Sequence, residues 1–177
     1  MADKSPPETL ENRGAGEDGR VFSPSAARNK DVILNTFNQY MPDNGVILEV
    51  ASGTGEHAVH IADALAGLQW RTSEFDEGLH DSIRAWINYS GHSDRIAEPI
   101  RLDASLDDWL GIDPGLDGII SCNMVHIAPW AAGRGLLRGA GKYLKLGGRL
   151  FLYGPYARNG EHTSPSNADF DALLKSR

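Results

Sequence analysis

The sequence predicts an α/β domain in which helices cover both faces of a parallel β-sheet. Three observations support this fold class. Short apolar runs that favour strands alternate with amphipathic helical segments, roughly one pair every 25 to 30 residues. The first run, at 46–50, does not alternate apolar with polar residues, which is typical of a strand buried on both faces. A glycine-rich turn follows the first run directly, as in a Rossmann-like, doubly wound sheet.

Composition and charge place the chain among ordinary globular domains. Its 177 residues suffice for one domain, and 41% of them are hydrophobic. The net charge of −7 comes without a basic run, so we expect no nucleic-acid partner. No apolar stretch reaches the roughly 18 residues of a membrane span, and the amino-terminal segment lacks the apolar core of a secretory signal. The single cysteine, Cys122, has no internal disulfide partner, which favours a reducing, cytoplasmic compartment.

The amino-terminal residues 1–22 are expected to form a disordered or flexible tail, and residues 23–177 the folded domain. The tail is rich in Pro, Glu, Gly and Asn and shows no hydrophobic period. Ser23 then provides a helix cap and Pro24 suits the first turn, so a helix is predicted over 25–40. Its predicted apolar face consists of Val32, Ile33, Phe37 and Tyr40.

The remaining elements follow in alternation. Strands are predicted at 46–50, 70–75, 99–102, 116–122 and 149–153. Helices are predicted at 57–65, 79–89, 133–144 and, begun by Ser166, 167–175; the third is expected despite its glycines. Because parallel strands need right-handed crossovers, we expect helices on both faces of the sheet. A ligand is expected beyond the carboxyl ends of the strands.

The loop after the first strand has a composition suited to binding a ligand. Gly53 and Gly55 allow a tight turn and a close approach to the backbone, and the next helix start offers N–H groups to an anion. Glu74 ends the second strand 21 residues after Gly53, a spacing that suits a carboxylate accepting both ribose hydroxyls. These features fit two cofactors, a nicotinamide dinucleotide and S-adenosylmethionine (SAM).

Three features favour SAM. Residues 53–58 match the dinucleotide pattern G-x-G-x-x-G/A, but Glu49 places an acid inside the strand where that pattern expects an apolar residue. Asp103 and Ala104, after the third strand, form an acid-plus-small pair suited to an adenine. The segment LKLGGRL at 144–150, before the fifth strand, fits the same interpretation.

With these residues, the sequence resembles the class I SAM-dependent methyltransferases. Within that superfamily it is similar to an uncharacterised methyltransferase-like family, over about residues 23–177. The motifs that carry the resemblance are ARNK at 27–30, LEVASGTG at 48–55, NMVHI at 123–127, YGPY at 153–156 and SNADFD at 166–171. The resemblance implies the fold, the cofactor SAM and a methyl-transferring enzyme, but no substrate.

The resemblance also implies roles for matching residues. Those of the methionine-binding loop are Glu49, Ala51, Ser52, Gly53 and Gly55. Ala51 replaces the glycine that is usual there, and alanine suits most turn geometries except those with φ > 0. The other cofactor-binding candidates are Glu74 for the ribose, Phe75 beside it, Asp103 and Ala104 for the adenine, and Asn123 near the transferable methyl group.

On the acceptor side, His126 is the candidate general base, with a packed histidine as the alternative. Tyr153 and Tyr156 are candidates to line the acceptor pocket or are hydrogen-bonded structural tyrosines. Arg28 and Asn29 are candidates to bind an anionic acceptor. The other histidines are scattered, so no metal is expected. We expect the acceptor to be a small molecule.

A complete domain of this class has two further strands after the fifth helix, and this sequence lacks them. The fifth strand would then be an uncovered apolar edge at 150–153. We therefore expect either that the domain is incomplete at its carboxyl end or that a homodimer or another partner covers this edge. Two other functions stay open. One is a NAD-dependent oxidoreductase, against which the position of Glu49 argues. The other is a non-catalytic adaptor that uses the same fold to bind a partner.

Overall fold

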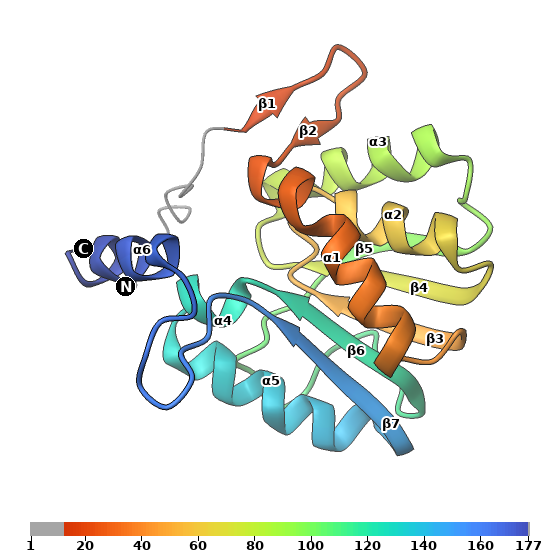
Figure 1. Cartoon of the computed structure of the whole chain (residues 1–177). Coiled ribbons are helices and arrows are strands. Elements are labelled where there is room, and N and C mark those ends of the chain that lie inside the picture. Colours follow the sequence, from red (N-terminus) through yellow and green to blue (C-terminus); the bar gives the residue numbers. More distant parts are fainter. Residues whose placement is uncertain (1–12, 177) are drawn as a thin grey trace, which may run out of the picture.

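The computed structural model describes residues 13–176. Its centre is a five-stranded, fully parallel sheet with the strand order β5-β4-β3-β6-β7 (Figure 1). The strands are β3 (Asn44–Val50), β4 (Gly67–Glu74), β5 (Ile96–Arg101), β6 (Leu116–Cys122) and β7 (Leu144–Tyr153). The predicted fold class is therefore confirmed. The strand order reverses between β3 and β6, where doubly wound sheets bind their ligands.

Helices cover both faces of this sheet. The helical segments of the described residues are α1 (Pro24–Tyr40), α2 (Glu56–Ala64), the 3₁₀ turn η1 (Glu77–Leu79), α3 (His80–Ser90), α4 (Met124–Ile127), α5 (Trp130–Tyr143) and α6 (Pro165–Lys175). Helices α1, α2 and α3 lie on one face and α5 on the other (Figure 1). Under the first group, the rings of Phe37 and Trp70 lie 5.9 Å apart. Under α5, Trp109 stacks on Tyr143 at 5.1 Å.

Helix α1 begins where the sequence predicts. The side chain of Ser23 accepts the N–H of Ala26, and Pro24 occupies the first turn. Ile33 and Phe37 are completely buried, as expected of the apolar face. The other two predicted members of that face are exposed, Val32 to 56% and Tyr40 to 60%. The buried stripe of α1 consists of Ala26, Asn29, Ile33 and Phe37 instead.

The glycines of α5 have a packing role. A Cβ on Gly135 would collide with the backbone of Ala104, and a Cβ on Gly139 would collide with the indole of Trp109. Both glycines are buried. They let α5 lie close against the segment after β5, so that residues unfavourable to an isolated helix are favourable here.

The structure differs from the sequence prediction before α1. Residues 14–22 form a hairpin, in which β1 (Gly14–Ala15) pairs antiparallel with β2 (Val21–Phe22), and not a tail. The indole N–H of Trp86 on α3 donates to the carbonyl of Val21 at 3.0 Å. The guanidinium of Arg20 lies over the ring of Tyr89, 3.4 Å from its centroid. These contacts order the segment, while residues 1–12 lie outside the described residues.

Three smaller differences concern the carboxyl-terminal half. The short helix α4 is absent from the prediction, because four residues carry too little periodicity. Helix α6 is capped by Ser164, which accepts the N–H of Asn167, and not begun by Ser166. β7 starts earlier than predicted, at Leu144. Within the described residues β7 is an edge strand, as the sequence predicts.

Candidate functional site

The loop between β3 and α2 turns through three left-handed residues. Ala51, Gly53 and Gly55 have φ values of 63°, 58° and 100°. The two glycines are therefore required by the backbone itself. Ala51 has a positive φ, the backbone conformation that alanine was expected not to suit. Its backbone is therefore strained, because it carries a Cβ. A Cβ on Gly55 would lie 3.0 Å from Cα of Ile83, which shows how closely α3 approaches the loop.

Glu74 braces this loop from the end of β4. Its Oε2 accepts the backbone N–H of Gly53 at 2.8 Å, and its Oε1 accepts the N–H of Asp76 at 3.1 Å. The residue is 8% exposed. A carboxylate offers about four lone-pair sites, so both oxygens retain capacity for a ligand hydroxyl. The structure thus brings Glu74 and Gly53 together, as the sequence spacing indicates.

Glu49 lies below the loop, in the core. The indole N–H of Trp70 donates to its Oε2 at 3.2 Å, and the residue is 1% exposed. Burial raises its pKa from 4.5 to about 8, although hydrogen bonds from Trp70 and Ser52 oppose the shift. The backbone carbonyl of Glu49 accepts the hydroxyl of Ser73 at 2.7 Å. The Glu49 carboxyl group is therefore protonated at neutral pH and contacts β4.

The two residues predicted to meet an adenine, Asp103 and Ala104, follow β5, and the cofactor-binding candidate Phe75 follows β4. Oδ1 of Asp103 accepts the N–H and the hydroxyl of Ser105, at 2.9 and 2.6 Å, which fixes this turn. Ala104 is buried, and its backbone carbonyl faces Gly135 on α5. The ring of Phe75 is 48% exposed and carries the guanidinium of Arg101 at 4.8 Å.

Beyond β6 the backbone turns at Asn123, which has a φ of 63°. Its N–H donates to the carbonyl of Tyr153 at 2.8 Å, so the ends of β6 and β7 are joined. His126 follows on α4, and its ring meets that of Tyr156 edge-on, with centroids 4.6 Å apart. Tyr153 packs against the core cluster beneath α1. Of the two tyrosines, Tyr156 is the one that contacts the candidate base.

The two acceptor candidates on α1 are placed differently. Asn29 is buried, and its Oδ1 pairs with Nε2 of His57 on α2 at 2.8 Å. In this arrangement Asn29 joins α1 to α2, and its role towards an acceptor stays a prediction. Arg28 is exposed.

Two residues near the loop were not predicted from the sequence as site residues. The carboxylate of Glu56 accepts the N–H of Ser23 at 2.7 Å. The hydroxyl of Ser82 donates to the carbonyl of Thr54 at 2.8 Å and accepts the N–H of Val21 at 3.0 Å. Both side chains are buried and tie the hairpin and α1 to the loop. A first-turn acid gave a weak signal for Glu56, and nothing in the sequence singles out Ser82.

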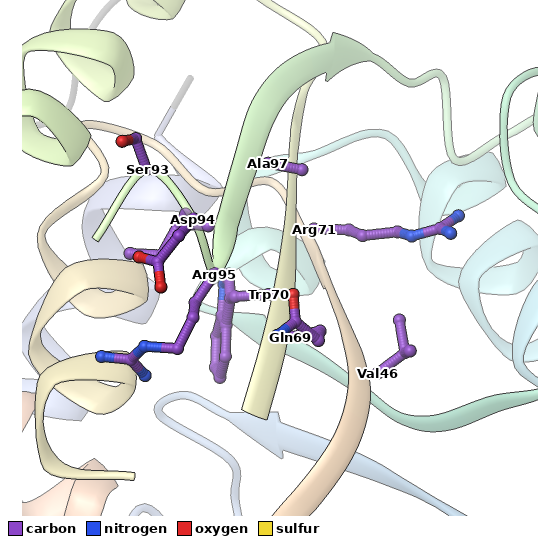
Figure 2. A pocket seen from close by; sticks show the side chains of 9 residues that line it. Val46, Gln69, Trp70, Arg71, Ser93, Asp94, Arg95 and Ala97 are labelled. Carbon is purple, nitrogen blue, oxygen red and sulfur yellow. The ribbon is translucent and has the colours of Figure 1, made fainter. Parts of the chain in front are cut away.

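A shallow hollow lies at the amino ends of the strands, away from the site residues at their carboxyl ends. That hollow is lined by the beginnings of β3, β4 and β5 and by the residues just before β5. Figure 2 shows Arg71 and Arg95 there, pointing away from each other.

In the part of the chain that the structure describes, no three His, Cys, Asp or Glu side chains gather as metal ligands. None of the described helices is long and apolar enough to cross a membrane.

A family model described as "Protein of unknown function (DUF938)" matches residues 20–177. The chain belongs to the DUF938 family. Its matched region covers α1, the whole sheet and α6, so all the site residues described above lie within the DUF938 match.

Solved structures share the fold of this DUF938 chain at low sequence identity. The SAM-dependent methyltransferase SibL, in its apo form, matches with a TM-score of 0.68 and 21% identity, over 85% of this chain and 42% of SibL. An O-methyltransferase family protein from Burkholderia thailandensis matches with a TM-score of 0.68 and 16% identity, over 84% and 43%. The glycopeptide N-methyltransferase MtfA complexed with SAM matches with a TM-score of 0.60 and 19% identity, over 70% and 53%. The DUF938 chain therefore has the Rossmann-like methyltransferase fold and spans about half the length of these structures.

Proposed function

We propose that this chain binds SAM and transfers its methyl group to a small-molecule acceptor. The observation that carries the proposal is the contact between Glu74 and Gly53, at 2.8 Å. It sets a carboxylate beside a left-handed glycine turn at the switch point of the sheet. The three solved structures with the same fold are methyltransferases by name, which supports the same chemistry.

The donor set suits the parts of SAM. The amino end of α2, which begins after Gly55, offers backbone N–H groups to the carboxylate of the methionine end. Glu74 would accept the ribose hydroxyls, and the half-exposed Phe75 offers an aromatic face to the adenine. Asp103, at the start of the turn after β5, offers a carboxylate to the adenine amino group.

SAM, when bound, supplies a methyl group on a positively charged sulfur, already activated for displacement. The work of the chain is then to hold the acceptor in line and to exclude water, because positioning supplies much of the catalysis in such transfers. Asn123 follows β6 at the carboxyl end of the sheet, and its backbone is fixed by the bond from its N–H to the carbonyl of Tyr153.

The test is calorimetric titration with SAM, its demethylated product S-adenosylhomocysteine (SAH), and NAD. We expect micromolar binding of SAM and SAH, and at least a tenfold loss of affinity in Glu74→Ala, since charge-assisted hydrogen bonds contribute about 1.5–3 kcal/mol each. Glu77→Ala is the matched control. Glu77 is an exposed acid three residues away whose carboxylate lies 3.8 Å from Arg101.

Other results would contradict the proposal in different ways. Binding of NAD without SAM would favour an oxidoreductase. A folded protein that binds none of the three ligands would favour the adaptor function. An equal loss of SAH affinity in Glu74→Ala and Glu77→Ala would show that Glu74 has no special role at the ribose.

A further inference from the structure

The position of His126 is fixed by the backbone around it. β6 ends at Cys122, Asn123 has a left-handed backbone, and α4 begins at Met124. The N–H of His126 donates to the carbonyl of Asn123 at 3.3 Å. Asn123 is in turn bonded to β7 through Tyr153. A non-glycine residue held at positive φ costs free energy, and such residues gather at functional sites.

Because Gly154 has no side chain, the imidazole of His126 can lie against the backbone there. A Cβ at position 154 would collide with Nε2 and Cδ2 of His126. The rings of Tyr156 and His126 meet edge to face, with their centroids 4.6 Å apart and an interplanar angle of 67°. The ring of His126 is therefore held by packing, between the backbone after β7 and Tyr156.

Nε2 of His126 is buried and has no hydrogen-bond partner among residues 13–176. Buried polar atoms in proteins are nearly always paired, so an orphaned ring nitrogen calls for an explanation. The other nearby titratable groups are poor proton acceptors. Burial raises the pKa of the Cys122 thiol well above its ordinary value and raises that of the Tyr156 phenol. Burial lowers the pKa of His126, which leaves the imidazole neutral at pH 7.

The surroundings of His126 along the chain are apolar and aromatic. Ile127 is 53% exposed, Trp130 80% and Tyr156 40%. Exposed apolar and aromatic side chains offer contacts to an apolar ligand, and the imidazole offers one polar group to it.

We propose that the acceptor is a phenol and that His126 accepts the proton of its hydroxyl group. This inference rests on the proposed methyl transfer. The phenolic oxygen forms a bond to the methyl carbon as its proton passes to the imidazole. The bond between sulfur and that carbon breaks, and its electron pair remains on sulfur. The imidazolium then returns the proton to solvent. Tyr156 covers the imidazole and is displaced by the aromatic ring of the acceptor.

The test uses a series of phenols whose own acidity varies. With SAM at pH 7.5, we expect His126→Asn to lower kcat/KM at least a hundredfold for phenol, which is neutral at this pH. For 2,4-dinitrophenol, which is already ionised, the loss should stay below about threefold. His92→Asn is the matched control, because His92 lies before β5, at the opposite end of the sheet, where it pairs with Asp63. Equal losses for both phenols would overturn the role of His126 as a base.

A second measurement is independent of turnover. His126→Asn should bind SAH as tightly as the wild type, and nuclear magnetic resonance titration of the wild type should show a histidine, absent from the variant, that titrates below pH 6.5. A wild type that fails to bind SAH would overturn the proposed function. A wild type that binds SAH but methylates no phenol, or a His126 that titrates above pH 6.5, would overturn this inference alone.

Discussion

Ala51 and Gly53 share nearly the same left-handed backbone, but only Ala51 carries a Cβ. A left-handed conformation costs an L-residue roughly 1–2 kcal/mol. We therefore expect Ala51→Gly to raise the free energy of unfolding by about 1 kcal/mol. Gly53→Ala should lower it by a similar amount, since no atom lies within 4 Å of a Cβ at that position. Urea unfolding measures both changes, and a less stable Ala51→Gly protein would contradict backbone strain at Ala51.

The raised pKa of Glu49 makes the stability of the fold depend on pH. The folded state keeps the proton up to about pH 8, whereas the unfolded chain loses it near pH 4.5. The stability that this proton provides is fully present below pH 4.5. It is lost as the pH rises through about 8, with a slope of about 1.4 kcal/mol per pH unit between the two values.

Replacing Glu49 with glutamine should remove this dependence, because the amide stays neutral and can still accept from Trp70. Chemical unfolding at pH 5 to 9 is the measurement. We expect Glu49→Gln to be more stable than the wild type at pH 8, with the difference shrinking towards pH 5. Parallel pH profiles of the two proteins would show that Glu49 does not hold a proton when folded.

At this scale the sequence predicts residues at strand ends but not their partners. Glu74 and Gly53 could be paired in advance, because parallel neighbouring strands bring their carboxyl ends to one edge of the sheet. Asn29 could not be placed, since a helix position alone does not say which neighbour its amide will meet. Ser82 could not be found at all, because its contacts join segments 28 and 61 residues away.

Among the elements, α5 offers a direct test of packing against helix propensity. Gly139→Ala should destabilise the protein by roughly 1–3 kcal/mol, because the added methyl group collides with Trp109. Gly141→Ala is the matched control on the same helix, where a Cβ meets nothing within 4 Å. This control should gain about 0.5–1 kcal/mol from helix propensity. Thermal or urea unfolding distinguishes them, and stabilisation by both substitutions would contradict the packing role.

The predictability of an element follows from its length and pattern. The strands and the longer helices repeat their apolar residues over enough positions to give a period, and Ser23 with Pro24 marks the start of α1. The hairpin strands have two residues each and α4 has four, so neither gives a period. The exposed positions of Val32 and Tyr40 depend on where the sheet meets α1, which is a tertiary property.

For the molecule as a whole, ligand binding and stability are linked. A ligand that binds only the folded state adds about 2.7 kcal/mol of stability at a concentration of 100 times Kd. For a chain of this size we expect SAH at that concentration to raise the unfolding midpoint by roughly 5–10 °C. Scanning calorimetry tests this. The same SAH concentration should shift Glu74→Ala much less, and equal shifts would mean that SAH binds away from Glu74.

The bonds from Thr54 through Ser82 to Val21 run from the glycine loop to the hairpin, and the indole of Trp86 lies along this route. Trp86 is within 3.4 Å of a Cβ at Gly55 and packs edge-on against Phe22 at 5.2 Å. An indole so placed changes its fluorescence when its neighbours move. The difference in emission between the wild type and Trp86→Phe is thus an optical signal of the state of the loop, available without any attached dye.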